Sequence, residues 1–525
     1  MRNRLGVGAA AVAIGLAAVG DVAAAPPELL MRAAETPVLI GLATNVFLDV
    51  CVVVDDKEPL PVVTDVGFSM DGTTLHRDVA EVRLASVSGS GKQERVRPFG
   101  VPVSGAAVFA FKDRQPLAAG TNVFRVTCRL RDDANLLHRV CLQCSGVKLA
   151  DGRLVRPRDG WQPIGKRLGL ALRRAGDDGV AVYRIPGLVA TPRGTLIAVY
   201  DQRMRGWADL PADVRIGMSR STDKGQTWAP MRTILDMGEH DKFKGNGAGD
   251  PCAWVDPRSG TIWVAALWSH GDRGWRGSGP GLTPDETGQW LLVRSTDDGL
   301  TWSAPTNITR QVKRPDWRLL LQGPGRGIAM QDGTLVVPAQ FKDAANVPHA
   351  TLMSSRDGGA TWAIGTGAEP RTTEAQVVEL AGGALMLNMR DDRGGSRSVA
   401  VTRDLGRTWT AHPSSRRALP EPVCMASLIR LWAHENIAGR NLLLFSNPAV
   451  DKAPRRRLTI KVSADEGLSW PEAYHTLLDE GVSAGYSCLT AVDRESVGIL
   501  YEGSAAHLVY QRFTLRDLLR LPPEE

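Results

Sequence analysis

The chain has 525 residues, 43% of them hydrophobic and 23% charged, with 63 basic and 57 acidic side chains. This length allows two or three domains with their own cores, and a mean hydropathy of −0.14 excludes a polytopic membrane protein and a disordered chain. The formal charge of +6 is spread along the chain without a run of five or more Lys or Arg, which argues against a nucleic-acid partner.

Residues 1–25 have the layout of a secretory signal peptide. Two early arginines precede an apolar stretch from Leu5 to Val19, and small residues follow up to Ala25. This order predicts export, with an uncleaved N-terminal anchor as the alternative. No later segment is long and apolar enough to predict a membrane span.

Seven cysteines are too few for a disulfide scaffold. Cys141 and Cys144 form a C-x-x-C pair, but no second pair lies at zinc-ligand spacing, so the sequence does not support a structural zinc site. We expect the cysteines to pack as small hydrophobic residues in strands. Formation of one or two disulfides after export is the alternative.

Short apolar runs separated by turn-like clusters fill residues 36–150. The runs are Val38 to Leu48, Cys51 to Val54, Val79 to Val87, Val108 to Phe111, Asn122 to Leu130 and Leu136 to Leu142. Strands at this spacing, without helical periodicity, predict a small N-terminal β-sandwich domain. A polar link, Asp151 to Gly160, leads into the rest of the chain, residues 160–525.

This second region carries an internal repeat of the form S-x-D-x-G-x-T-W. Its five copies are centred on Asp223, Asp297, Asp357, Asp404 and Asp465, and they account for five of the 14 tryptophans. In each copy the Ser and Asp side chains suit a hairpin turn, Gly provides a positive φ, and Trp anchors the next strand. The spacing of the copies predicts a β-propeller with elaborated four-stranded blades.

A further set of motifs accompanies the repeats. They include Tyr183-Arg-Ile-Pro186, Tyr200-Asp-Gln-Arg203, Gly249-Asp-Pro251, Thr373-Glu-Ala-Gln376, Asn388-Met-Arg390 and Gly485-Tyr-Ser-Cys-Leu-Thr490. From about Gly165 onward the chain resembles the sialidase (neuraminidase) family of glycoside hydrolases, and it is similar to bacterial exo-sialidases. The resemblance implies an all-β fold, a six-bladed β-propeller preceded by a small β-sandwich. In this family the repeats are called Asp boxes.

A sialidase must bind the carboxylate that sialic acid carries on its anomeric carbon, and arginine suits this because its guanidinium makes bidentate, permanently charged contacts. In the family three arginines do so, and motif matching carries them to Arg184, Arg390 and Arg455. The last is chosen because it lies three residues before Leu458, and a slip of one position would choose Arg456 instead. Arg203 is expected to support the carboxylate end of the pocket, and Asp250 to face the amide or hydroxyls of the sugar.

The resemblance also assigns three catalytic residues. A carboxylate nucleophile would be repelled by the substrate's own carboxylate, and sialidases use tyrosine instead. That tyrosine maps to Tyr486, and the base that takes its proton to Glu374. The general acid maps to Asp209, 25 residues after Arg184, with Asp213 as the alternative.

Outside these residues, Tyr501 fits a strand position better than a catalytic one, and the pocket candidates Trp268 and Gln340 are weaker. We therefore expect an exported, monomeric exo-α-sialidase without metal or organic cofactor. It would act with retention on sialylated glycoproteins, glycolipids or oligosaccharides. The alternatives are transfer to an acceptor or an intramolecular variant, an enzyme for another 2-keto sugar acid, and a non-catalytic, glycan-binding propeller.

Overall fold

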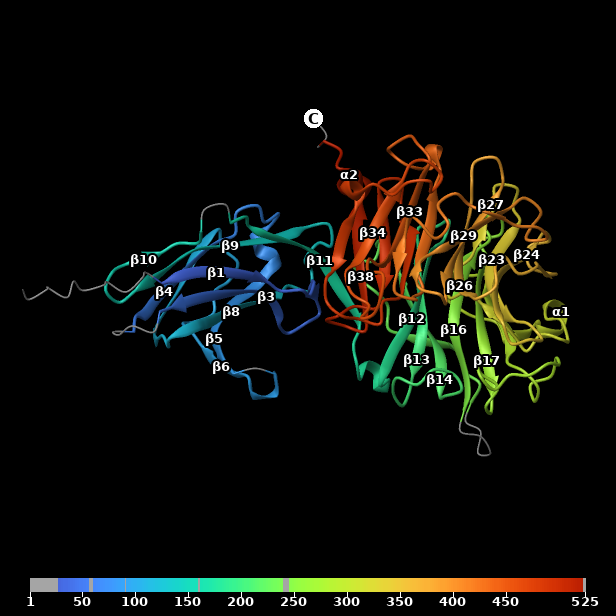
Figure 1. Cartoon of the computed structure of the whole chain (residues 1–525), viewed down its shortest axis with the longest axis horizontal. Helices are drawn as coiled ribbons and strands as arrows, with labels where there is room; N and C mark the ends of the chain where they lie inside the picture. Colours follow the sequence, from blue (N-terminus) through green and yellow to red (C-terminus); the bar gives the residue numbers. More distant parts are fainter. Residues whose placement is uncertain (1–26, 56–59, 90, 159–160, 239–244, 523–525) are drawn as a thin grey trace, which may run out of the picture.

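The computed structural model describes residues 27–55, 60–89, 91–158, 161–238 and 245–522. Figure 1 shows a smaller N-terminal body, coloured blue to teal, beside a larger body that holds the rest of the chain. The predicted signal peptide, residues 1–25, lies outside the described residues. Within them, no helix is both long and apolar enough to cross a membrane.

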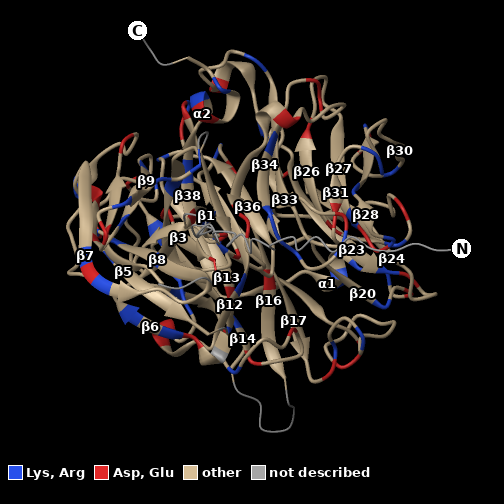
Figure 2. Cartoon of the chain, turned by 60° about the vertical axis from the view of Figure 1, so that its left-hand side comes forward, with Lys and Arg blue, Asp and Glu red and all other residues tan. Residues whose placement is uncertain are grey.

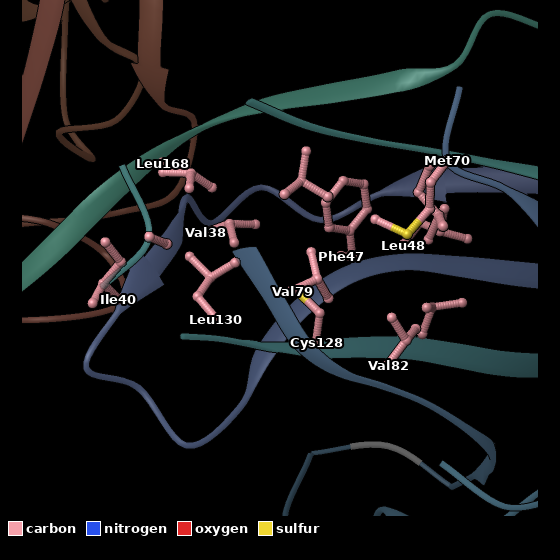
Figure 3. Close-up of a cluster of buried hydrophobic side chains, with 14 of the residues drawn as sticks. Val38, Ile40, Phe47, Leu48, Met70, Val79, Val82, Cys128, Leu130 and Leu168 are labelled. Atoms are coloured by element: carbon pink, nitrogen blue, oxygen red, sulfur yellow. The ribbon is translucent and has the colours of Figure 1, made fainter. Parts of the chain in front are cut away.

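The N-terminal body is built from two antiparallel sheets that share one core. The first has the order β1 (Glu28–Ala33), β3 (Asn45–Val54), β8 (Gly120–Leu130), β5 (Val79–Ser88) and β6 (Arg95–Pro98). The second has the order β9 (Arg139–Leu149), β4 (Val62–Ser69) and β7 (Val108–Pro116), with β10 (Leu154–Val155) beside β9. Side chains such as Phe47, Leu48, Val82 and Cys128 fill the space between the sheets (Figure 3). This arrangement corresponds to the predicted sandwich, although its first strand begins at Glu28.

A continuous sheet joins the two bodies. The first half of β11 (Ile164–Arg173) pairs with β9, and its second half pairs with β38 (Leu508–Thr514) near the C-terminus. The short strand β2 (Val38–Ile40) pairs in parallel with the middle of β11. Because backbone hydrogen bonds run from the sandwich into the last propeller sheet, the bodies are not connected by a flexible linker alone.

The propeller sheets follow one another along the chain. Their strands are β12 (Val182–Ala190), β13 (Leu196–Arg203), β14 (Val214–Ser221) and β15 (Arg232–Leu235); β16 (Asn246–Val255), β17 (Ile262–His270), β18 (Gln289–Ser295) and β19 (Thr306–Asn307), with β21 (Gly325–Arg326) on β16; β20 (Leu319–Gln322), β23 (Leu335–Lys342), β24 (Pro348–Ser355) and β25 (Ala363–Ile364), with β22 (Ile328–Ala329) on β23; β26 (Thr372–Glu379), β27 (Leu385–Asp391), β29 (Ser398–Thr402) and β30 (Thr410–Ala411); β32 (Ser427–Leu431), β33 (Leu442–Pro448), β34 (Leu458–Ser463) and β35 (Thr476–Asp479); and β36 (Ser487–Ala491), β37 (Ser496–Tyr501) and β38, completed by β11. Two strands, β28 (Gly395–Ser396) and β31 (Pro420–Glu421), form a separate small sheet.

Neighbouring sheets pack in a ring. Strand β12 contacts β16 and β36, and β26 contacts β23 and β32, which in turn contacts β36. The ring is closed by β11, which precedes the propeller in sequence but completes its last sheet. The only α-helices in the described residues are the short α1 (Thr309–Val312) and α2 (Leu515–Leu519). The predicted all-β class with a propeller is confirmed, and the sheets are compatible with the six blades predicted.

The repeats form the turns expected of them. In the first copy Gly225 N–H donates to Ser221 Oγ at 2.9 Å, Thr227 N–H donates to Asp223 Oδ1 at 2.9 Å, and Gly225 has a φ of 86°. The four other copies make the same two kinds of contact. These side chains hold the chain reversal between the last two strands of a sheet, so their role is structural.

The seven cysteines are all buried and none is joined in a disulfide. The described residues hold no group of three or more His, Cys, Asp or Glu placed to bind a metal ion. Basic and acidic residues are interspersed along the chain, for example along β7 (Figure 2), in keeping with the dispersed charge of the sequence.

Candidate active site

A cavity of about 400 Å³ gathers most of the predicted site residues. Its lining includes Arg184, Asp209, Asp250, Gln340, Glu374, Arg390, Arg455 and Tyr486. Of the residues predicted for catalysis and substrate binding, only Arg203 lies outside this lining, and the weaker candidate Trp268 lies outside it too. A cavity of about 390 Å³ between sandwich and propeller has no such set, so the first cavity is the candidate active site.

Irregular backbone in the inner strands of three sheets places these side chains in the cavity. The pairing of β12 with β13 shifts register between Arg184 and Gly187, that of β16 with β17 between Gly249 and Cys252, and that of β26 with β27 between Thr372 and Ala375. Each shift coincides with a cavity residue, and such bulges re-aim a side chain out of the regular alternation.

Two residues at these bulges also have left-handed backbone. Ile185 has a φ of 56° and Asp250 a φ of 58°. A β-branched residue such as Ile is rarely found there, and this conformation has a cost that the surrounding contacts must offset. The backbone N–H of Ile185 donates to Glu502 Oε1 at 3.0 Å, and that of Asp250 donates to Asp201 Oδ1 at 2.9 Å.

Tyr486 and Glu374 form the central pair. The Tyr486 hydroxyl lies 2.6 and 2.7 Å from the two carboxylate oxygens of Glu374, and Arg390 Nη1 donates to both residues, at 3.0 Å to Tyr486 Oη and 2.7 Å to Glu374 Oε2. Burial raises the pKa of Tyr486 well above its ordinary value near 10, the charge of Glu374 adds to this, and Arg390 and Arg184 oppose it. The phenol is therefore protonated at rest, with an acceptor for its proton in contact.

Three guanidinium groups surround the Tyr486 ring. Those of Arg184 and Arg455 lie 5.0 and 5.6 Å from the ring centroid, and Arg390 contacts the hydroxyl. Arg455 is held by the carbonyl oxygens of Ala484 and Val423, at 2.8 and 2.7 Å. The cluster places concentrated positive charge at one end of the cavity, which suits a carboxylate ligand.

Only one arginine of the run 455–457 reaches the cavity. Arg456 pairs with Glu35 at 3.4 Å and Arg457 with Glu480 at 3.3 Å, both at the surface. The structure therefore brings Arg455, the residue chosen from the sequence, into the cavity and leaves the alternative Arg456 outside its lining.

Asp209 lies at the cavity mouth, where 78% of its side chain is exposed. One carboxylate oxygen lies 2.7 Å from Arg203 Nη1 and 3.8 Å from Arg184 Nη1. The alternative acid, Asp213, is outside the cavity lining and lies near Arg205 and Arg215 at 3.5 and 3.6 Å.

Arg203 is buried behind Asp209. Its guanidinium contacts Asp201 Oδ2 at 3.2 and 3.1 Å in addition to Asp209. Burial raises the pKa of Asp201 to about 6 against the charge of Arg203. Burial, together with the charges of Asp201 and Glu374, raises the pKa of Asp250 well above its ordinary range, so Asp250 is suited to donate a hydrogen bond into the cavity when protonated.

Sequence reasoning missed two features of this site. The first is Glu502, a buried carboxylate that binds Arg184 through two contacts, Nε to Oε1 at 2.9 Å and Nη2 to Oε2 at 3.2 Å. Its signal was a charged residue at the end of the apolar strand β37. The second is an apolar wall, formed by Leu210, Leu267, Trp275, Leu319 and Leu321, whose members come from separate segments and share no motif.

Glu502 makes stability near the cavity depend on pH. Burial alone would raise its pKa, but Arg184 and the N–H groups of Ile185 and Tyr486 lower it below its ordinary value. A lowered pKa means that the contribution of Glu502 to stability is present above the unfolded-state pKa, near 4.3, and is lost as pH falls through the folded-state value.

The variant Glu502→Gln is therefore expected to have an unfolding free energy about 2 kcal/mol lower than that of the parent at pH 7. It should accordingly unfold at a lower urea concentration. The difference should shrink between pH 5 and pH 3, because the parent then loses the same charge. Urea titrations of both proteins across this range measure it, and a gap that stays constant with pH would contradict the assignment.

Comparisons with known proteins identify the family of the chain. A family model described as a BNR repeat-like domain matches residues 191–499. A sialidase of Bacteroides fragilis is 49% identical over 414 residues, 78% of this chain and 76% of the relative. The solved structure of a Hadza microbial sialidase aligns with a TM-score of 0.87 at 43% identity and covers 93% of this chain and 99% of that chain.

A more distant solved structure shares the fold. It is the intramolecular trans-sialidase from Ruminococcus gnavus in complex with oseltamivir carboxylate, with a TM-score of 0.58 at 19% identity, covering 68% of this chain and 99% of that chain. The family match and the identity to the Bacteroides enzyme confirm the predicted resemblance. This chain belongs to the sialidase family of glycoside hydrolases.

Proposed function

We propose that this sialidase is a retaining exo-α-sialidase that hydrolyses terminal, non-reducing sialic acid from glycoproteins, glycolipids or oligosaccharides. The observation that carries the proposal is the hydrogen-bonded pair Tyr486–Glu374, which lies next to three arginines in one cavity. A glycan-binding propeller has no need for a phenol in contact with a base, so this pair favours catalysis over the non-catalytic alternative.

In the first step Arg184, Arg390 and Arg455 bind the substrate carboxylate, which sets the anomeric carbon near Tyr486. The phenol oxygen attacks that carbon as its proton passes to Glu374, and Asp209 protonates the leaving oxygen as the glycosidic bond breaks. Tyrosine serves better than a carboxylate here, because a neutral phenol is not repelled by the substrate's own negative charge.

In the second step Asp209, now a carboxylate, takes a proton from the attacking water. The water oxygen bonds to the anomeric carbon, the bond to Tyr486 breaks, and Glu374 returns its proton to the phenolate oxygen. Two displacements at one carbon restore its original configuration, so the sialic acid is released as the α-anomer. Asp209 suits both roles because its exposed position at the mouth is open to the leaving group and to water.

The apolar wall supports an N-acylated sugar as the substrate. Trp275 and Leu321 are two of its members, and they line the same cavity as the polar Asp250. An acyl methyl group gains from burial against such a wall, about 0.8 kcal/mol per carbon. A deaminated 2-keto acid has only a hydroxyl at that position and would gain less, which makes it the weaker candidate.

The proposal is tested by following release of the fluorophore from a fluorogenic α-sialoside between pH 4 and pH 8. We expect turnover by the purified protein, and none at any pH would overturn the enzyme assignment. Proton NMR of the first sugar released distinguishes retention from inversion. A 3-fluorosialosyl fluoride, whose covalent intermediate breaks down slowly, should label the peptide that contains Tyr486 in a mass spectrum.

Transfer remains the second candidate, because the same residues form the same intermediate. The fold shared with the Ruminococcus trans-sialidase favours testing it. Product analysis with sialyllactose separates the outcomes: free sialic acid indicates hydrolysis, an anhydro sugar indicates the intramolecular reaction, and a new sialoside formed in the presence of excess lactose acceptor indicates transfer.

The position of the third arginine yields a paired prediction. Arg455→Lys should lower kcat/KM about 10-fold or more. A lysine ammonium cannot hold the carbonyl oxygens of Ala484 and Val423 and also make a bidentate contact with a carboxylate. Arg456→Lys is the matched control and should stay within about twofold, since its exposed contact to Glu35 contributes little. Steady-state kinetics on the fluorogenic sialoside test the pair, and the reverse order of effects would contradict the assignment.

A further inference from the structure

Trp207 stands apart from the other tryptophans. Among the described residues it is the one tryptophan with an exposed side chain, 61% of which is accessible to solvent. The others are buried or half-buried in the sheets and in the Asp-box turns. Tryptophan is enriched at contact surfaces, because its ring combines a large apolar face with a polar N–H group.

A single guanidinium ties this ring to the candidate acid. Arg203 Nη1 donates to the carbonyl oxygen of Trp207 at 2.8 Å and lies 2.7 Å from the carboxylate of Asp209. Arg203 is itself fixed by its two contacts to Asp201. The indole and the acid therefore sit on one short segment at the mouth of the cavity, in positions that one buried side chain sets together.

A histidine completes the surface. The rings of Trp207 and His507 meet edge to face, with their centroids 5.4 Å apart and an interplanar angle of 74°. His507 Nδ1 accepts the backbone N–H of Tyr183 at 3.3 Å, so in the neutral ring Nε2 carries the proton. Burial lowers the pKa of His507, which favours this neutral form. The pair thus combines an apolar face with a hydrogen-bond donor.

A small hollow adjoins Trp207. It measures about 230 Å³ and is lined by Arg203, Arg205, Trp207 and Asp213 among others. Arg205 and Asp213 bring polar groups of both signs next to the indole. An apolar ring beside donors and acceptors is the combination that binds a hexose, which has an apolar C–H face and a rim of hydroxyls.

We propose that Trp207 and His507 form the subsite for the leaving-group sugar, the residue to which sialic acid is attached. This rests on the proposed function, because the position of the sugar follows from Asp209 as the acid. The leaving oxygen must lie within hydrogen-bond distance of Asp209. The sugar that carries this oxygen is then outside the sialic acid cavity, against the segment that holds Asp209 and Trp207.

Two substrates with the same sialic acid but different leaving groups test this. Sialyllactose leaves a sugar, whereas α-sialosyl fluoride leaves a fluoride ion that cannot reach Trp207. For Trp207→Ala, kcat/KM on sialyllactose should fall about 5- to 10-fold while that on the fluoride stays within about twofold. Trp207→Phe should retain most activity on both, and Leu300→Ala, another exposed apolar residue, is the control for surface change.

Lactose provides a readout that does not depend on the chemical step. As the leaving product it should inhibit the parent enzyme, and its inhibition constant should rise in Trp207→Ala by a similar factor. An equal loss on both substrates would overturn the proposal, because Trp207 would then act only by positioning Asp209. Unchanged kinetics on sialyllactose would overturn it too. Failure of the parent protein on both substrates would instead refute the proposed function.

Discussion

Tyr486→Phe is expected to lower kcat/KM on a fluorogenic α-sialoside by about 10³-fold or more. The substitution removes one oxygen, and that oxygen is the proposed nucleophile, in contact with both carboxylate oxygens of Glu374 and with Arg390. Removing a nucleophile that acts as a unit with its base costs several orders of magnitude in rate, while substrate binding is retained. KM should therefore change far less than kcat.

The matched control is Tyr501→Phe. Tyr501 is also fully buried and makes one side-chain hydrogen bond, to Gln511 Oε1 at 3.1 Å, but it lies outside the cavity lining. Loss of that bond should cost about 1 kcal/mol of unfolding free energy with little change in kcat. Circular dichroism and the thermal midpoint show whether both variants fold. If Tyr486→Phe keeps full activity, the nucleophile is not Tyr486, even for an active sialidase.

Much of the propeller was predictable because short local sequence patterns specify its turns. Each Asp box closes its turn with side chains from within eight residues, so the sequence alone contains the geometry. Asp209 and Asp213 lie on one segment, and the structure separates them: Asp209 is exposed at the cavity mouth and faces Arg203, whereas Asp213 is partly buried and faces Arg205. The same holds for Arg455 and Arg456.

The sandwich was predicted less accurately, for local reasons. The run Val38 to Leu48 is divided in the structure, because Gly41 adopts a φ of 87° and Asn45 binds the backbone of Leu39 through its amide. Leu136 is buried although it precedes β9 in a loop, so the apolar pattern placed the strand three residues too early. Strand β4 was missed because Thr64 and Asp65 interrupt its alternation, at the point where its pairing with β7 and β9 shifts register.

The candidate active site also contains features that no alternation pattern can reveal. Bulges at Arg184, Asp250 and Glu374 turn side chains away from the regular period of two, and their contacts join different blades, as Glu374 does with Tyr486. Glu502 and Arg184 are 318 residues apart in sequence, so nothing in the local pattern around either residue indicates the pair. The family motifs named the residues that we propose contact substrate, and the structure adds the residues that hold them.

The pair Arg397–Glu421 is one such support. Neither side chain is accessible to solvent, and Arg397 Nη1 lies 2.9 Å from Glu421 Oε2. Arg397 also donates to the side chain of Asn388 at 2.7 Å and to the carbonyl of Cys424 at 2.7 Å. These partners adjoin the cavity arginines, because Asn388 is two residues before Arg390 on β27, and Cys424 follows the residue whose carbonyl holds Arg455.

Arg397→Met is therefore expected to lower the unfolding free energy by about 3–5 kcal/mol, because it leaves the Glu421 carboxylate buried without a counter-charge. The double variant Arg397→Met/Glu421→Gln should recover part of this loss, since a neutral amide needs no counter-charge and its oxygen can still accept from the N–H of Asp391 or Cys424. Arg83→Ala, which breaks an exposed pair with Glu81, should change stability by less than about 1 kcal/mol.

Urea unfolding and the thermal midpoint measure the stability changes, and kinetics at a temperature where each variant is folded measure the effect on the site. Because Arg397 acts through Asn388 and Cys424 on two arginines that are proposed to bind the substrate carboxylate, KM should rise more than kcat falls in the single variant. A stability loss below about 1 kcal/mol would show that the buried charge finds another partner. A fall in kcat with unchanged KM would show that the support acts on the Tyr486–Glu374 pair instead of on the anion-binding arginines.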